Sequence, residues 1–571
     1  MDAQSRRAVP RTEHMAEHST AGPGGPQDGA TMTEQPPETT PAAAARASDP
    51  ATGTTTASVG GVAAEGAQPL GERVDNRTRA PQSTAFQEFM ASQWAPAQDG
   101  ELPREEVADY AAQRRLRISR GHTGERLVIP AGAPKVRSND TDYRFRPHSA
   151  FAHLTGLGVD HEPGAVLVLE PVDPGTGDEG GDHIATLHFH PMAGRETQEF
   201  YADTRNGQFW VGDRPTLREI SSAYGLPARD LSGLQPAVSK DVGADGVQVR
   251  VVRGQDAAVD VMVESARLAG GILLEDADPK DDELAESLSE LRLIKDDHEV
   301  GQLRRSVEMT VRGFEDVVRA LPGAIGRARG ERVVEGAFFS RARAEGNDLG
   351  YDTIAASGSN ATVLHWIRNT GEIRPQEMIL VDAGVEAESL YTADITRTLP
   401  VTGTYTPVQR RIYQAVLDAA DHAFTVAVPG SRFRDVHDAA MSVLAARLEQ
   451  WGLLPVSAQV SLSVEGQHHR RWMPHGTSHH LGLDVHDCAQ ARRELYQDAV
   501  IEPGMVFTIE PGLYFKAEDL AVPEEYRGIG VRIEDDVLIT AEGNENLSAA
   551  LPRDPDDVES WMQGLFESAA G

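Results

Sequence analysis

The chain contains a single cysteine, Cys488, among its 571 residues. One cysteine excludes an intrachain disulfide, and it also excludes a zinc site built from several cysteines. Such a composition suits a reducing compartment, so we expect a cytoplasmic protein.

Basic residues are also scarce. The sequence has 54 Lys and Arg against 88 Asp and Glu, which gives a formal net charge of −34. A chain this acidic binds nucleic acid and anionic membranes poorly. No apolar run approaches the roughly 18 residues of a membrane span. No apolar segment follows Arg6 and Arg7, so a secretory signal is not expected. We therefore expect small or peptide-like partners, no nucleic acid and no membrane.

Large apolar side chains are nearly absent from residues 1–82, which are rich in Ala, Thr, Gly, Pro and Glu. A segment of this kind buries too little surface to offset the entropy lost on ordering. We expect a disordered low-complexity tail with no catalytic role, and the alternative is a regulatory or docking segment.

The rest of the chain divides into two predicted domains, 83–285 and 286–571. In the first, TAFQEFMASQW is helix-like, and GAVLVLEPV and HIATLHFH are strand-like, so we expect an α/β domain. The acidic stretch from Glu275 to Glu290 marks the predicted boundary.

The second domain begins with an amphipathic helix over 300–318. A further helix starts at a capping box formed by Thr406 and Gln409, with Pro407 at its first position, and ends before Pro429. Strand-like segments alternate with these helices. The predicted fold class is α+β.

Five residues of the second domain stand in short apolar, β-like segments: Asp382, Asp394, His479, Glu510 and Glu534. Carboxylates in apolar surroundings are costly unless a positive group holds them. Four carboxylate charges balance two divalent cations, so this set predicts a two-metal hydrolytic site.

Strand geometry supports part of this set. If a hairpin turns about Glu388, Asp382 and Asp394 lie directly opposite each other and need a cation between them. The alternative is a pair of solvated acids at an exposed edge. In VRIEDD, alternation places Arg532 and Glu534 on one face. Glu510 follows an apolar run and precedes Pro511, so it is expected at a strand end.

The histidines are harder to place. His475 and His479 have the spacing of a zinc-protease helix, but no glutamate base lies between them, so that motif is rejected. His479 and His486 have opposite strand parity, and a bend is needed to bring both into one site. Other histidines are expected at the surface or in packing rather than as ligands: His468, His469 and His480. His188 and His190 share a strand face and are interpreted as ordinary half-exposed residues, with metal binding as the alternative.

Oxygen-rich ligation with one imidazole favours Mn, Mg or Co, and the histidine argues mildly against Mg or Ca. A water or hydroxide that bridges two metal ions is the expected nucleophile. One carboxylate would take its proton, and a free histidine would stabilise the oxyanion.

The phrases HGTSHHLGLDVHD, EPGMVFTIEPGLY, YRGIGVRIEDD and VDAG…DITRTLPV resemble those of the pita-bread metallopeptidases, and most closely the Xaa-Pro aminopeptidases. The resemblance runs from about Asp142 to the C-terminus and includes RPHSAFAHLTGL. It implies a pita-bread catalytic domain preceded by a creatinase-type α/β domain. It also implies an enzyme that releases the N-terminal residue from peptides with proline second, and a homo-oligomer, dimer or tetramer.

The resemblance further implies a role for each residue. The five ligands would bind two ions, Mn²⁺ by expectation and Co²⁺ or Zn²⁺ as alternatives. Asp394 and Glu534 would bridge them, and Glu510 would also accept the proton of the bridging hydroxide. The remaining implied site residues are His365 and His475 at the proline side, His486 at the substrate carbonyl, and Arg532 beside the ligands or the substrate backbone.

Two features depart from the family pattern. The segment between the two aspartates is one residue longer than the commonest spacing, and the loop CAQARRELYQDAV lacks the usual Gly/Tyr-rich sequence. The alternatives are a prolidase restricted to Xaa-Pro dipeptides, a non-catalytic pita-bread module that binds peptides or proteins, and a creatinase-like enzyme. The last two lack the metal ligands that this chain keeps.

Overall fold

The computed structural model describes residues 81, 83–95, 100–139, 141–159 and 163–570. The predicted tail, apart from Pro81, lies outside the described residues. No helix within these ranges is both long and apolar enough to cross a membrane.

The N-terminal half is built on a five-stranded sheet in the order β6–β5–β4–β1–β7. The pairs β1–β7 and β5–β6 are parallel, and β4 runs antiparallel to both β1 and β5. The strands are β1 (Glu125–Pro130), β4 (Val166–Pro171), β5 (His183–Phe189), β6 (Ala228–Asp230) and β7 (Gln248–Val251). The strand predictions for GAVLVLEPV and HIATLHFH are thus confirmed.

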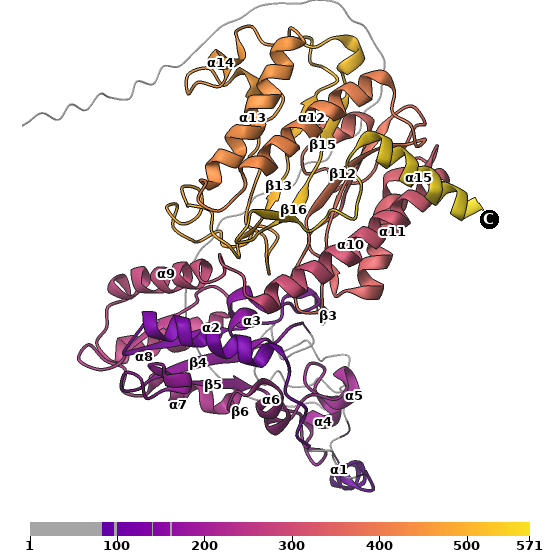
Figure 1. Cartoon of the computed structure of the whole chain (residues 1–571). Coiled ribbons are helices and arrows are strands. Elements are labelled where there is room, and N and C mark those ends of the chain that lie inside the picture. The colour runs from indigo at the N-terminus through magenta and orange to yellow at the C-terminus, as the bar shows by residue number, and fades with distance from the viewer. Residues whose placement is uncertain (1–80, 82, 96–99, 140, 160–162, 571) are drawn as a thin grey trace, which may run out of the picture. The chain divides into compact units, whose positions relative to one another are not determined.

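Alternation along the strands gives this sheet two buried faces. Leu127 and Ile129 of β1 lie in one apolar cluster, and Val128 lies in another. The first cluster is completed by α2 (Val107–Gly121), α3 (Ser149–Thr155) and α6 (Leu217–Tyr224), and the second by α7 (Leu234–Ser239) and α8 (Ala257–Ala269). Helices therefore cover the sheet from both sides (Figure 1). Smaller elements are α1 (Thr84–Ala91), β2 (Val136–Ser138), β3 (Thr141–Asp142), α4 (Glu199–Ala202) and α5 (Gln208–Val211).

The acidic stretch expected at the domain boundary is helix α9 (Leu274–Glu290). Its Leu284 and Leu288 are buried in the same cluster as Leu127. The helix runs past residue 285, and the boundary there stays a prediction.

The C-terminal half mixes helices with several small sheets. The sheets are β12–β10–β9, β13–β16–β17, β14–β15 and β11–β8. Their strands are β8 (Asp348–Leu349), β9 (Ile354–Ser357), β10 (Met378–Ala383), β11 (Val385–Glu386), β12 (Ile395–Pro400), β13 (Val506–Ile509), β14 (Gly512–Phe515), β15 (Ile529–Arg532), β16 (Asp535–Ile539) and β17 (Asn544–Asn546). The α+β prediction is confirmed.

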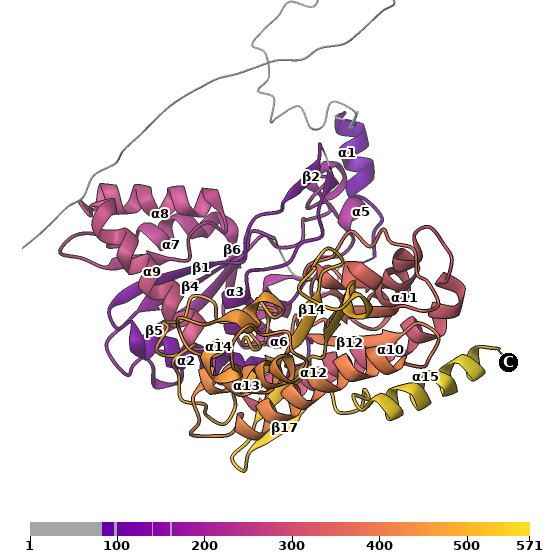
Figure 2. The same cartoon turned by 90° about the horizontal axis from the view of Figure 1, so that it is seen from above.

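The helices of this half pack around the strands (Figures 1 and 2). They are α10 (Asp297–Ala324), α11 (Gly330–Glu345), α12 (Pro407–Val426), α13 (Phe433–Gln450), α14 (Ala458–Ser461) and α15 (Pro555–Ala570). The predicted capping box at Thr406 is present, because its side chain accepts from the Gln409 amide and Gln409 accepts from the Thr406 amide. One large cluster joins Phe314, Phe338, Ile379 and Phe507, all fully buried. This rigid core carries the strand ends on which the predicted ligands stand.

Candidate metal centre

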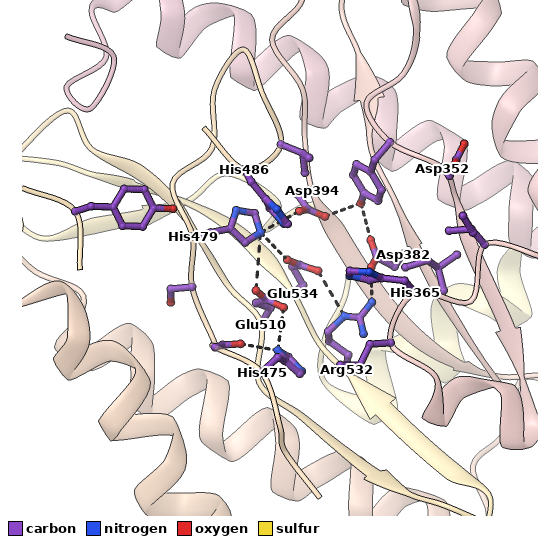
Figure 3. A pocket seen from close by; sticks show the side chains of 18 residues that line it. Asp352, His365, Asp382, Asp394, His475, His479, His486, Glu510, Arg532 and Glu534 are labelled. Carbon is purple, nitrogen blue, oxygen red and sulfur yellow. Dashed lines mark hydrogen bonds and ion pairs between the residues drawn. The ribbon is translucent and has the colours of Figure 1, made fainter. Parts of the chain in front are cut away.

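A cavity of about 550 Å³ opens in the C-terminal half. All nine residues predicted for the site line it: His365, Asp382, Asp394, His475, His479, His486, Glu510, Arg532 and Glu534 (Figure 3). The structure thus brings together side chains that are separated by up to 169 positions in the chain.

The carboxylates stand at strand ends. Asp382 belongs to β10, Asp394 directly precedes β12, Glu510 directly follows β13, and Glu534 directly precedes β16. The small sheets meet here, since the Glu534 amide donates to the Thr396 carbonyl at 3.1 Å. Strand ends hold side chains rigidly while leaving one side open to the cavity.

His479 lies at the centre of the acidic group. Its Nε2 is 3.3 Å from Oδ2 of Asp394, 3.8 Å from Oε1 of Glu510 and 4.0 Å from Oε1 of Glu534. Ligand atoms of Asp394, His479 and Glu534 all lie within 4.8 Å of one another, and no other group of three such residues is this compact in the described part of the chain. One imidazole and several carboxylates therefore converge on one small volume.

Asp382 also lies beside this acidic group, although the register of strands β10 and β12 differs from the predicted one. Across the β10–β12 pair, Asp382 faces Thr396, not Asp394, so the predicted register was wrong. The turn is centred one residue later, because Leu390 adopts a positive φ of 73° and its amide donates to the Ala387 carbonyl. Asp394 is still close, since the Tyr351 hydroxyl lies 2.6 Å from Oδ1 of Asp382 and 2.5 Å from Oδ1 of Asp394.

The centre carries a surplus of buried negative charge. Burial raises the pKa of Glu534 well above its ordinary range, and the neighbouring Asp394 adds to the rise. Burial also raises the pKa of Glu510, to about 7, against the opposing effects of His479 and Arg532. Burial alone would lower the pKa of His479, but Asp394 and Glu510 beside it raise that pKa to about 9. The raised pKa values of Glu510, Glu534 and His479 show that the site holds protons tightly, because its buried negative charges repel one another. Bound cations would relieve the same repulsion, so the site is suited to metal ions.

The donor set is mainly carboxylate oxygen with one imidazole nitrogen, which fits hard or borderline divalent ions. The chemistry of the side chains and their surplus charge thus agree with a metal centre.

A buried polar chain connects the ligands to one another. Arg532 donates through Nη2 to Asp382 and, through Nη1 at 3.2 Å, to the Tyr514 hydroxyl. That hydroxyl is 2.7 Å from Nε2 of His475, whose Nδ1 is 3.5 Å from Oε2 of Glu510. The predicted proximity of Arg532 to Glu534 is confirmed, with 3.7 Å between Nε and Oε2. Arg532 and His475 therefore orient two of the carboxylates.

The bend required between His479 and His486 is present. The Asp487 amide donates to the His480 carbonyl at 2.9 Å, and the segment turns back on itself. The two imidazole rings come to 4.3 Å between centroids. The buried ion pair between Arg292 and Asp487 fixes the returning arm, with 2.9 Å between Nε and Oδ1.

Several residues behind the ligands were not predicted from the sequence. Thr396 donates to Oε2 of Glu534 at 2.7 Å, and Asp536 accepts from the Asp394 amide. Below them Arg397 and Asp535 form a fully buried ion pair of 2.7 Å. Tyr351 stands in an irregular segment with no sequence signal, whereas Asp536 lies in the acidic run that pointed to Glu534.

The cavity is not lined by the other five histidines considered above, His188, His190, His468, His469 and His480. His469 is buried against Ser461, and His480 stacks on Phe433. The expectation that His188 and His190 are half-exposed was wrong for His188, which is buried in β5, whereas His190 is half-exposed and pairs with Glu199. Neither of the last two belongs to a three-residue ligand group within the described ranges.

Residues 301–541 match the family model of metallopeptidase family M24, and residues 110–247 match that of the aminopeptidase P N-terminal domain. The chain is 49% identical over 485 residues to Xaa-Pro aminopeptidase 1 of Streptomyces coelicolor, which covers 85% of this chain and 93% of that protein. It is 32% identical over 475 residues to the Xaa-Pro aminopeptidase of Escherichia coli, with 81% and 98% covered.

Solved structures give the same result. Aminopeptidase P from E. coli in a low-pH form matches with a TM-score of 0.69 and 29% identity, over 81% of this chain and 99% of that one. Proline aminopeptidase P II from Yersinia pestis matches with a TM-score of 0.67 and 30% identity, over 80% and 99%. These matches confirm the predicted architecture, a pita-bread catalytic domain preceded by a creatinase-type N-terminal domain.

Proposed function

Because the chain belongs to the Xaa-Pro aminopeptidases of metallopeptidase family M24, we propose that it hydrolyses the bond between an N-terminal residue and a following proline. The protein is a metal-dependent aminopeptidase. The observation that carries the proposal is the convergence of Asp382, Asp394, His479, Glu510 and Glu534 on one cavity. A non-catalytic binding module has no need of such a costly acidic group.

In this proposal the same five residues hold two divalent metal ions, with Mn²⁺ as the expected pair and Co²⁺ or Zn²⁺ as alternatives. Asp394 and Glu534 are the proposed bridging ligands, because their ligand atoms and that of His479 all lie within 4.8 Å of one another. When bound, the ions supply positive charge that activates a water molecule for attack on the peptide carbonyl.

The side chains of the cavity divide the remaining tasks. Glu510 accepts the proton of the attacking water, because its carboxylate lines the cavity beside His475 and His479. His486 donates to the carbonyl oxygen as negative charge develops there. His365 and His475 line the side of the cavity assigned to the proline ring. Arg532 holds Asp382 in place through their ion pair.

The relatives favour an aminopeptidase over a prolidase, since they carry the name Xaa-Pro aminopeptidase at identities up to 49%. The proposal includes a cytoplasmic location, a dimeric or tetrameric assembly, and peptides with Xaa-Pro N-termini as partners. Its support is the single cysteine, the family resemblance and the acidic composition.

The test compares three substrate types on one metal-analysed sample: an Xaa-Pro tripeptide, the corresponding Xaa-Pro dipeptide and an Xaa-Ala tripeptide. We expect the Xaa-Pro tripeptide to be cleaved fastest, with two metal ions per chain. Exclusive cleavage of the dipeptide would instead establish a prolidase. Failure to cleave any of the three in the metal-loaded protein would overturn the proposal.

A further inference from the structure

One wall of the cavity is an irregular segment, residues 357–371, which we term the wall loop. It begins at Ser357, the last residue of β9, and continues through a short 3₁₀ helix (Gly358–Thr362) into a segment without helix or strand. Leu364, His365 and Ile367 of this loop line the cavity. Since the loop has few backbone hydrogen bonds of its own, other groups must fix its shape.

The carboxylate of Glu331 supplies this fixation. Glu331 lies at the start of α11 and is fully buried. Its Oε1 accepts from the Ser357 amide and from Nδ2 of Asn360, both at 2.8 Å. Its Oε2 accepts from Nε1 of Trp366 at 2.8 Å and from the Gly371 amide. Four donors spread from one end of the wall loop to the other therefore meet on one side chain.

The charge of Glu331 is held by these bonds rather than by a cation. Its four donors are all neutral groups: two backbone amides, the side-chain amide of Asn360 and the indole of Trp366. A buried carboxylate without a counter-charge is costly unless its oxygens are saturated with donors. Its place in the first turn of α11 adds a favourable interaction with the helix dipole. A buried carboxylate that is costly to desolvate thus stands where four donors of the wall loop meet.

A second anchor acts at the far end of the loop. Asn369 is fully buried with a positive φ of 46°, and its Oδ1 accepts from the Ala355 amide while Nδ2 donates to the Thr353 carbonyl. The carboxylate of Glu331 and its four donors, which we term the clamp, are closely packed, because a Cβ on Gly371 would lie 2.5 Å from Oε1 of Glu331. The loop is consequently built as a fixed wall and not as a moving flap.

We propose that Glu331 is a positioning residue for the peptidase reaction, which sets the place of His365 by holding the wall loop against α11. The inference rests on the proposed function, in which His365 lies beside the substrate proline. Glu331 does not line the cavity, so any effect it has on the reaction passes through the wall loop.

Glu331→Gln is the discriminating variant. It keeps the volume, but one acceptor oxygen becomes an amide that points its own hydrogens at two donors. We expect faster hydrogen exchange across 357–371, unchanged metal content and a fall of about 10- to 100-fold in kcat/KM for an Xaa-Pro tripeptide, since displacement of about 1 Å can cost that much. Glu335→Gln, half-buried one turn further along α11, is the matched control and should leave all three unchanged.

A double-variant comparison separates positioning from a general loss of stability. If Glu331 acts through His365, then Glu331→Gln combined with His365→Ala should be hardly slower than His365→Ala alone. The inference would be overturned if the losses of kcat/KM in Glu331→Gln and His365→Ala were fully additive in the double variant. It would also be overturned if Glu331→Gln matched Glu335→Gln in hydrogen exchange across 357–371 and in kcat/KM. Should Glu331→Gln fail to fold, Trp366→Phe removes only one of the four donors and should shift exchange and kcat/KM in the same direction.

The exchange measurement does not need enzymatic activity. Suppose that the wild-type protein has no peptidase activity but that Glu331→Gln still exchanges faster than the wild type across 357–371. That result would support the role of Glu331 in fixing the wall loop and reject the proposed function. Intact protection in an otherwise active Glu331→Gln enzyme would reject the clamp alone.

Discussion

The Tyr351 hydroxyl lies 2.5 Å from Oδ1 of Asp394. The hydroxyl oxygen of Tyr351 is also within hydrogen-bond distance of Asp382, but a phenol has only one proton to donate. Tyr351 therefore couples the orientation of two carboxylates that come from β10 and from the segment before β12.

Tyr351→Phe removes this coupling without changing the ring. We expect metal affinity to fall about 10- to 100-fold, the usual result of losing a residue that orients a ligand. Titration of the metal-free protein with Mn²⁺ measures the effect. Tyr143→Phe changes an exposed tyrosine in the same way and should bind as the wild type does. Equal affinities for the two variants would show that Tyr351 plays no part in ligand orientation.

Glu534→Gln and Asp394→Asn should each abolish activity and lower metal content, because each removes an anionic ligand from the centre of the site. Elemental analysis and a peptide assay on one sample give both quantities. Glu502→Gln alters an exposed carboxylate and serves as the control. Full activity in either ligand variant would refute the two-metal assignment.

The metal-free protein should lose stability as pH rises from 5 to 8. For Glu510 the pKa in the folded protein is about 7 against an ordinary value of 4.5, and for His479 it is about 9 against 6.5. Both groups hold their protons more tightly when folded, so their stabilising effect is complete at low pH and is lost as pH rises through the folded values. Bound cations replace those protons, and added Mn²⁺ should raise Tm more at pH 8 than at pH 5. Thermal unfolding with and without chelator measures both effects, and a metal-free protein of equal or greater stability at pH 8 contradicts this expectation.

His486→Ala should lower kcat by a factor of about 100 to 1,000 while metal content stays near that of the wild type. The reason is that its proposed contact strengthens only as charge develops on the carbonyl oxygen. His422→Ala, at an exposed position of α12, is the control. A kcat defect that parallels metal loss would make His486 a ligand or a structural residue instead.

Arg397→Met should destabilise the folded protein by about 3 kcal/mol, the lower end of the usual cost of breaking a buried ion pair, because Arg553 still lies 3.4 Å from Asp535. The guanidinium is fully buried, pairs with Asp535 and also donates to the carbonyl of Glu534. Denaturant unfolding of the metal-free protein measures the change, with Arg343→Met at an exposed position of α11 for comparison. A loss below 1 kcal/mol would mean that the pair contributes little to stability.

Local sequence signals were sufficient for much of the architecture. Thr406 and Gln409 predicted the start of α12 because a capping box depends only on neighbours in the chain. Glu510 was placed correctly at a strand end, since an apolar run followed by Pro-Gly leaves few alternatives. The five predicted ligands could be singled out because carboxylates in apolar segments are rare enough to stand out, and the structure brings all five to one cavity.

The failures arose where distant segments decide the outcome. The hairpin register was missed because Leu390 adopts a positive φ, and leucine carries no signal for that conformation. Tyr351 and Thr396 take part in the site through contacts that sequence spacing does not encode. Glu331 was not singled out from the sequence, because its four donors come from residues 26 to 40 positions away.

The bonds of Arg397 also constrain the order of events during synthesis. Its guanidinium donates to the carbonyl groups of Leu551 and Pro552, about 155 residues later in the chain. Until these residues have been synthesised, Arg397 of β12 lacks both carbonyl partners. Long-range pairings of this kind form late, because loop closure must precede them. We therefore expect the five predicted ligands to come together only after the C-terminal segment has been synthesised.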